Sequence, residues 1–146
     1  MLCVECGGNM EESREALEYC VRNEAFIISD IPHFICDSCG EVEIDLASAE
    51  ILSDRAHALY REKHGLLNPD EIRAVRKSFG VTQREFETII NSGKTTVSRW
   101  ESGAVMQPAV VDTLLRALRS HPDVFYDLAK ISKAEAVEQV ENLVNA

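Results

Sequence analysis

Two pairs of cysteines constrain the fold of this chain more than any other feature of its sequence. The pairs are Cys3 with Cys6 and Cys36 with Cys39, and 29 residues separate them. A two-residue spacer lets both sulfurs of a pair reach one ion at about 2.3 Å, and two such pairs complete a tetrahedron. The sequence therefore predicts one structural zinc ion per chain, on which the folding of a small domain commonly depends.

Two other interpretations of these cysteines remain open at this point. One is a site of three cysteines completed by His33, and the other is a redox-active dithiol. Four thiolates favour structural zinc because they leave no open position for water or substrate. A glycine follows each pair, at Gly7 and Gly40, where positive φ is tolerated. Cys20, in an alternating segment, is expected to be a small buried thiol.

Length and composition indicate a cytoplasmic protein of one or two small domains. The chain has 146 residues, and 45% of them are hydrophobic. No apolar run approaches the roughly 20 residues needed to cross a bilayer, and we expect no membrane association. Thiols stay reduced in the cytoplasm, which also favours metal ligands over disulfides.

The net charge of −10 is distributed unevenly along the chain. Residues 1–66 hold 5 basic and 14 acidic residues, a net charge of −9. Residues 67–121 hold 8 basic and 6 acidic residues, a net charge of +2. The acidic segment would repel nucleic acid and attract a basic partner, whereas the central segment is compatible with DNA.

The first 66 residues combine short strands with one helix. Alternating or β-branched residues predict strands near 17–21, 25–28 and 33–36. An apolar stripe then predicts a helix from Leu46 to about Lys63, ended by Gly65. The stripe consists of Leu46, Ala49, Leu52, Ala56, Leu59 and Tyr60.

Helix signals dominate the rest of the chain. Asn68-Pro69 begins one helix and Thr82, with Glu85 three residues later, begins a second. A turn at 91–93 leads to a short third helix from Thr95 or Thr96 to Ser102, and Pro108 begins a fourth. Short helices near 123–130 and from 132 onward complete the pattern.

Residues 81–103 have the pattern of a helix-turn-helix, in which the second helix enters the major groove of DNA. Val97 and Trp100 should face the core, which leaves the neighbouring polar side chains outward. Arg99 is the expected base-reading residue because its fork matches the two acceptors of guanine. Gln83 is expected to contact a phosphate. The predicted DNA-contacting residues are Gln83, Arg84, Lys94, Thr95, Thr96, Ser98 and Arg99. An all-helical bundle with an inert polar face is the alternative.

With both halves considered, the chain resembles the MqsA-type antitoxins, a YgiT-type zinc finger joined to an Xre/Cro-type helix-turn-helix. The resemblance rests on Cys3, Cys6, Cys36 and Cys39 and on the run Ser98-Arg99-Trp100-Glu101, and it covers about residues 1–125. It implies that Glu101 pairs with a basic residue of the first helix, here Arg76. It also implies a zinc domain that neutralises a toxin, often a basic ribonuclease, and a homodimer that binds palindromic operator DNA.

The expected fold class is therefore α+β. A strand-rich zinc- and partner-binding domain with one helix occupies residues 1–66, and an all-α helix-turn-helix and dimerisation domain occupies residues 67–131. An amphipathic helical extension occupies residues 132–146 and could strengthen the dimer, touch the toxin or bind a chaperone. The alternative functions are a zinc-containing regulator without a toxin and, much less favoured, a dithiol oxidoreductase. A protein that is not an enzyme is expected.

Overall fold

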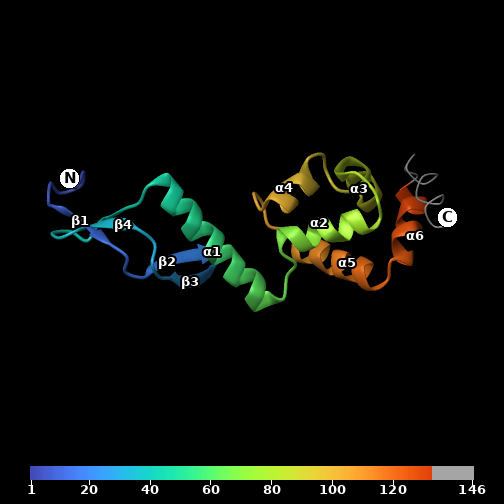
Figure 1. The fold of residues 1–146 in the computed structure, drawn as a ribbon, viewed down its shortest axis with the longest axis horizontal. Helices are drawn as coiled ribbons and strands as arrows, with labels where there is room; N and C mark the ends of the chain where they lie inside the picture. The colour runs from blue at the N-terminus through green and yellow to red at the C-terminus, as the bar shows by residue number, and fades with distance from the viewer. Residues whose placement is uncertain (133–146) are drawn as a thin grey trace. The chain divides into compact units, whose positions relative to one another are not determined.

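The computed structural model describes residues 1–132, which form two compact units (Figure 1). The amino-terminal unit is Met1–Gly65, and the carboxy-terminal unit begins at Leu66. The first contains five strands and one helix, and the second contains five helices within the described residues. The α+β class predicted from the sequence is confirmed. The extension predicted from Ser132 lies, apart from Ser132 itself, outside the described residues.

The strands of the amino-terminal unit form two small antiparallel sheets. A three-stranded sheet has the order β1-β4-β5, from Met10–Ser13, His33–Cys36 and Val42–Glu43. The second sheet is a hairpin of β2 (Leu17–Val21) and β3 (Glu24–Ile28). Arg22 and Asn23 form its two-residue turn with φ of 48° and 66°, the conformation that matches the twist of a tight hairpin. Strands β1 and β5 were not predicted, because each is short and bordered by the cysteine loops.

Helix α1, Leu46–His64, packs against the β2–β3 hairpin, as Figure 1 shows. Its first turn is capped by Asp45, whose carboxylate accepts a hydrogen bond from the Ser48 amide at 2.8 Å. Its end is Gly65 in the left-handed region, with φ of 64°. At that end Lys63 and His64 both bond Glu24, at 2.9 and 2.7 Å, and the Lys63 hydrogen bond is the largest cause that lowers the pKa of Glu24.

One expectation about side-chain burial in this unit is wrong. Cys20 is exposed, because the outward face of β2 that carries it is not covered by another element of the unit. The apolar stripe of α1 is buried only at its middle, where Leu52 and Ala56 meet the hairpin. Leu46 and Leu59 remain 77% and 40% exposed because the hairpin is too narrow to cover the whole helix face.

The carboxy-terminal unit packs its helices around a continuous apolar core. The helices are α2 (Pro69–Ser78), α3 (Gln83–Ile90), α4 (Thr96–Ser102), α5 (Ala109–Ser120) and α6 (Asp123–Ser132). Phe125 of α6 lies at the centre, stacked on Phe79 with 4.0 Å between ring centroids and near Phe86 at 5.8 Å. All three rings are buried, and pairs of this geometry stabilise a core beyond the area they bury.

Polar contacts fix the ends of these helices as the sequence predicted. Asn68 and Glu71 form a reciprocal capping box, and Thr82 accepts a hydrogen bond from the Glu85 amide. The start of the unit is also held by a buried carboxylate: Asp112 accepts from the Leu67 amide at 2.8 Å and from Gln107 at 3.1 Å. Leu67 is thereby attached to α5, 45 residues further along the chain.

Candidate metal centre and nucleic-acid interface

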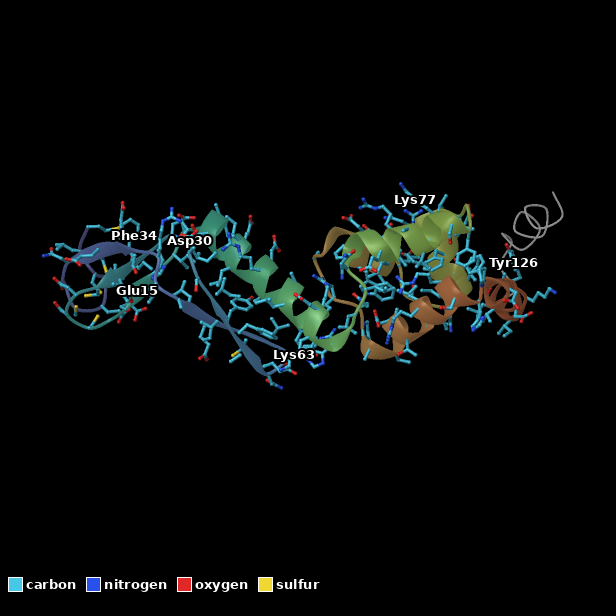
Figure 2. The ribbon with its side chains drawn as sticks, turned by 60° about the horizontal axis from the view of Figure 1, so that its bottom comes forward. Glu15, Asp30, Phe34, Lys63, Lys77 and Tyr126 are labelled. Carbon is cyan, nitrogen blue, oxygen red and sulfur yellow. The ribbon has the colours of Figure 1, made fainter. Side chains whose placement is uncertain are left out.

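The four predicted zinc ligands lie together in the amino-terminal unit. The sulfurs of Cys3 and Cys39 are 3.7 Å apart, those of Cys6 and Cys36 are 3.5 Å apart, and all four lie within 4.8 Å of one another. When four sulfurs surround a zinc ion in a regular tetrahedron with bonds of about 2.3 Å, neighbouring sulfurs are about 3.8 Å apart. The cluster therefore fits one structural zinc ion, and the sulfur atoms gather visibly at one end of this unit (Figure 2).

The two cysteine loops have the same backbone architecture. In each loop the amide of the first cysteine donates to the carbonyl five residues later, Cys3 to Gly8 and Cys36 to Glu41, both at 2.8 Å. The glycine after the second cysteine donates back, from Gly7 to Cys3 and from Gly40 to Cys36. Both glycines have φ of 76°, as the sequence analysis expected. This pseudo-symmetric pair of loops is what brings four thiols to one point.

Gly8 is a component of the centre that the sequence analysis missed. A Cβ at this position would lie 2.6 Å from Ser38 Oγ and 2.9 Å from Cys36 Sγ. The backbone of the first loop thus passes directly over the second, and only glycine permits the approach. The second glycine of Cys6-Gly7-Gly8 was the available sign of such a close contact.

Hydrogen bonds from backbone amides act to lower the pKa values of Cys36 and Cys39 and so favour their thiolate forms. Hydrogen bonds from the amides of Cys39 and Ser38 lower the pKa of Cys36 to about 7. For Cys39 the Glu41 amide acts in the same direction, but hydrogen bonds with the neighbouring thiols, Cys6 first, raise the pKa to about 12. Some of the four thiols therefore keep their protons when no cation is bound. A cation such as zinc would stabilise all four as thiolates, which is the form that binds zinc. His33 is not part of the cluster.

Helices α3 and α4 form the predicted helix-turn-helix. Asn91 ends α3 in the left-handed region, and α4 begins at Thr96 after Thr95, which also has positive φ. Val97 and Trp100 are buried in the core, as predicted. Five of the seven predicted DNA-contacting residues line one hollow of about 350 Å³ between the helices. They are Gln83, Arg84, Lys94, Thr95 and Ser98, and Glu87 completes the lining.

The other two predicted residues lie outside this hollow. Arg99 is exposed on α4, and Thr96 is half buried. A Cβ on Gly93 would be 3.2 Å from the Thr96 hydroxyl, so Thr96 points toward the turn. Gln83 donates to Glu101 at 3.3 Å, which occupies one of its two amide hydrogens.

Two buried carboxylates, only one of them anticipated, hold α4 in place. Glu101 accepts from Arg76 at 2.8, 3.0 and 3.1 Å, as the family resemblance implied. Glu87, which the sequence analysis did not identify, accepts from the Val97 amide at 3.2 Å and supplies the cap that Thr95 does not. An acidic residue between the core positions Phe86 and Ile90 was the sign of this role. Together the two carboxylates fix the orientation of the short helix on α2 and α3.

The basic residues on the surface of the helix-turn-helix differ in their ion pairing from the other arginines of the carboxy-terminal unit. Arg73, Arg76, Arg116 and Arg119 form ion pairs with acidic residues. Within residues 1–132, Arg84, Lys94 and Arg99 form no ion pair and are exposed. Their charges thus remain available to an external anion.

No helix among the described residues is long and apolar enough to cross a membrane.

Comparison with known proteins identifies antitoxins. The family model for the antitoxin component of bacterial toxin-antitoxin systems, MqsA, matches residues 1–129. Antitoxin MqsA of Escherichia coli (strain K12) is 25% identical over 130 residues, which cover 88% of this chain and 99% of that protein. Antitoxin HigA-2 of Vibrio cholerae serotype O1 is 26% identical over 65 residues, or 44% of this chain, and the match spans 62% of that relative's length.

Proposed function

Because this chain belongs to the MqsA antitoxin family, we propose that it neutralises a cognate protein toxin through its zinc unit and represses its own operon through its helical unit. The observation that carries this proposal is that the metal cluster and the acidic charge lie in one unit and the exposed basic residues of the helix-turn-helix lie in the other. The unit with the four-cysteine cluster holds a net charge of −9, whereas Arg84, Lys94 and Arg99, which are exposed and form no ion pair within residues 1–132, lie on the helix-turn-helix.

The charge of the zinc unit supports a basic partner. An acidic surface speeds encounter with a basic protein and disfavours DNA, whose phosphates it repels. A basic, RNA-binding ribonuclease is the toxin class that fits this charge. Zinc would act there as a structural ion only, because four thiolates leave no position for a substrate. The unit therefore has a binding role and no catalytic one.

The helical unit fits operator binding. Arg84 and Lys94 would contact phosphates at the edges of the groove, together with the remaining donor of Gln83. Thr95, Ser98 and Arg99, at or near the start of α4, would face the base edges, and the half-buried Thr96 would lie beside the turn at the edge of this surface. Two copies related by a twofold axis would present two such helices roughly 34 Å apart, one turn of DNA. The second copy would cover exposed apolar side chains of this unit, of which Val105 and Val110 are two.

A decisive test uses the protein encoded beside this chain's gene. Expressed alone, the neighbour should arrest growth, and co-expression of this chain should restore it because the complex hides the toxin's active surface. The two proteins should also copurify through an affinity tag on either one. Growth arrest that this chain does not relieve, together with no copurification, would leave a zinc-containing regulator without a toxin as the better description.

A further inference from the structure

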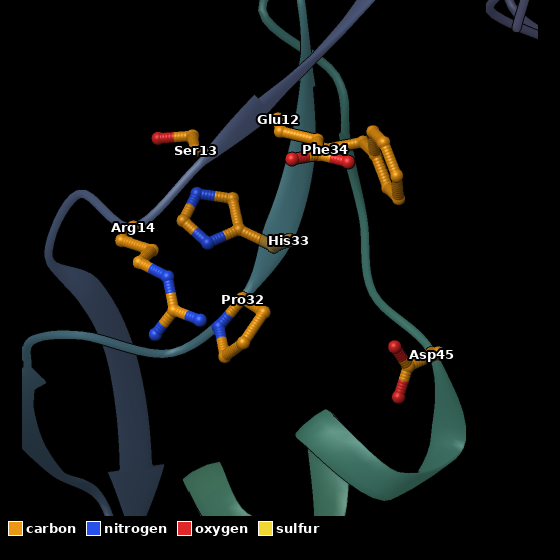
Figure 3. Close-up of a pocket in the computed structure, with 7 residues that line it drawn as sticks. All are labelled: Glu12, Ser13, Arg14, Pro32, His33, Phe34 and Asp45. Carbon is orange, nitrogen blue, oxygen red and sulfur yellow. The ribbon is translucent and has the colours of Figure 1, made fainter.

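A hollow of about 520 Å³ lies beside the three-stranded sheet of the zinc unit (Figure 3). Its lining includes His33 and Phe34, which are consecutive residues of β4 and so lie on opposite faces of the sheet. Their side chains therefore do not converge on one ligand. The hollow of about 350 Å³ between α3 and α4 is different, because polar side chains from both helices and from the turn meet in it. This second hollow lies on the surface that is proposed to face DNA.

Glu87 is the one acidic residue in the lining of this second hollow. The basic residues Arg84 and Lys94 and three residues with neutral polar side chains make up the rest of the lining. Glu87 is only 7% exposed, and its Oε1 accepts the hydrogen bond from the Val97 amide at 3.2 Å. A negative charge is thus held within a surface whose other charges are positive.

The fold of the helical unit explains the hydrogen bond of Glu87 but not its charge. A neutral side-chain oxygen, such as that of a glutamine amide, also accepts a hydrogen bond from a backbone amide. Neither Arg84 nor Lys94 forms an ion pair with Glu87 within residues 1–132. Burial of a carboxylate is unfavourable unless it is paired or bound by donors. The charge therefore indicates a ligand that donates hydrogen bonds to this hollow.

The chemistry of DNA limits which of its groups can approach a carboxylate. Phosphates are negatively charged and only accept hydrogen bonds, so Glu87 disfavours a phosphate that its basic neighbours would otherwise attract. In the major groove the donors on the base edges are the amino groups of adenine and cytosine. Adenine places the acceptor N7 beside its amino group, and a carboxylate would repel that atom, whereas cytosine presents N4 alone. The amino group of cytosine is therefore the ligand that fits.

We propose that Glu87 is a specificity-determining residue of the helix-turn-helix and accepts a hydrogen bond from the N4 amino group of an operator cytosine, directly or through one water molecule. Thr95 and Ser98, at and just after the start of α4, line the same hollow, so a base edge that meets them also reaches it. Bridging waters carry such specificity in protein–DNA interfaces. This inference rests on the proposed operator binding and adds a base contact from α3 to those of α4.

The test compares two charge removals on α3 of the zinc-loaded, full-length protein. Glu87→Gln keeps an oxygen for the Val97 amide but replaces the other oxygen by a donor, which cannot accept from cytosine N4. Glu85→Gln removes the same charge from the same helix outside the hollow, at a capping-box position that glutamine also suits. The unmodified protein first selects an operator from a pool of random duplexes. Both variants are then measured against every single-base substitution of that operator.

The two variants should differ in base preference at one operator position. We expect the unmodified protein to prefer cytosine there and Glu87→Gln to reduce that preference about ten-fold, whereas Glu85→Gln should keep it. Glu87→Gln should also bind duplexes without an operator several-fold more tightly, because the repulsive charge that disfavours phosphates in the hollow is gone.

Thermal unfolding separates this role from the structural one. Glu87→Gln should unfold within about a degree of the unmodified protein, because the hydrogen bond that caps α4 is retained. Glu87→Ala has no acceptor for the Val97 amide and should unfold a few degrees lower, besides losing the cytosine preference. If the alanine variant does not fold, Glu87→Gln alone decides the question.

Each of four results would overturn the inference. A base-preference profile of Glu87→Gln equal to that of the unmodified protein would remove Glu87 from base recognition and leave operator binding intact. A uniform loss of affinity at all positions would limit Glu87 to its structural role. A change confined to a position that prefers adenine would contradict the cytosine contact. Failure of the unmodified protein to select any sequence would contradict operator binding itself, and the inference with it.

Discussion

At the scale of single residues, the proposed DNA-facing surface depends on which arginines remain without an acidic partner within residues 1–132. Arg76 is committed to Glu101, and Arg119 to Glu71, whereas the exposed Arg99 has no acidic partner within residues 1–132. The former two contribute to the fold of the helical unit. Arg99 contributes nothing visible to that fold, so a functional role is the better explanation of its position on α4.

Arg99→Ala should therefore change DNA recognition without changing stability. We expect a loss of about 1–3 kcal/mol at one operator position and relaxed base preference there. Arg119→Ala, an exposed arginine of the same unit, is the matched control and should keep the base preference. Binding of both variants to a panel of single-base operator substitutions measures the effect. An unchanged preference of Arg99→Ala would show that Arg99 does not read a base.

At the scale of elements, the two cysteine loops depend on a close approach of their backbones. The loops have equivalent hydrogen bonds, but only the first must pass over the second, at Gly8. A methyl group there would displace Ser38 or Cys36, and Cys36 is a ligand. The geometry of the metal centre thus depends on a residue that does not touch the metal.

Gly8→Ala should consequently weaken zinc binding by about ten-fold or more, in the range found when residues that support metal ligands are changed. Asn9→Ala is the control, because only the backbone carbonyl of Asn9 bonds the second loop, at 3.0 Å to the Asp37 amide. Competition with a chromogenic chelator compares the two variants. Equal zinc affinities would mean that the loops shift without cost to accommodate the methyl group.

Most elements and the metal cluster were predictable from the sequence, since each has a local signature. Cysteine spacing, helix caps at Asn68 and Thr82, and the 3.6-residue period depend on neighbours along the chain. The missed features depend on contacts between distant segments. The capping of α4 by Glu87 and the approach at Gly8 both arise from residues that tertiary structure brings together. The exposure of Cys20 likewise reflects how far α1 covers the hairpin.

At the scale of the whole molecule, the two units divide the proposed function between them. Each has its own means of stability: a metal cluster with few buried apolar residues in the first, and a continuous apolar core in the second. Loss of zinc should remove the order of the first unit, because small metal-bound domains fold with their ion. The second unit has no such dependence in its core and should remain folded.

The central claim is this division, and two variants of the full-length protein test it most directly. Cys36→Ser removes a zinc ligand, and Arg99→Ala removes the proposed base contact. Affinity for the neighbour-encoded protein and for operator DNA should be measured for both. We expect Cys36→Ser to lose the protein partner and largely keep DNA binding, and Arg99→Ala to do the reverse. Loss of both activities in Cys36→Ser, or of partner binding in Arg99→Ala, would contradict the account.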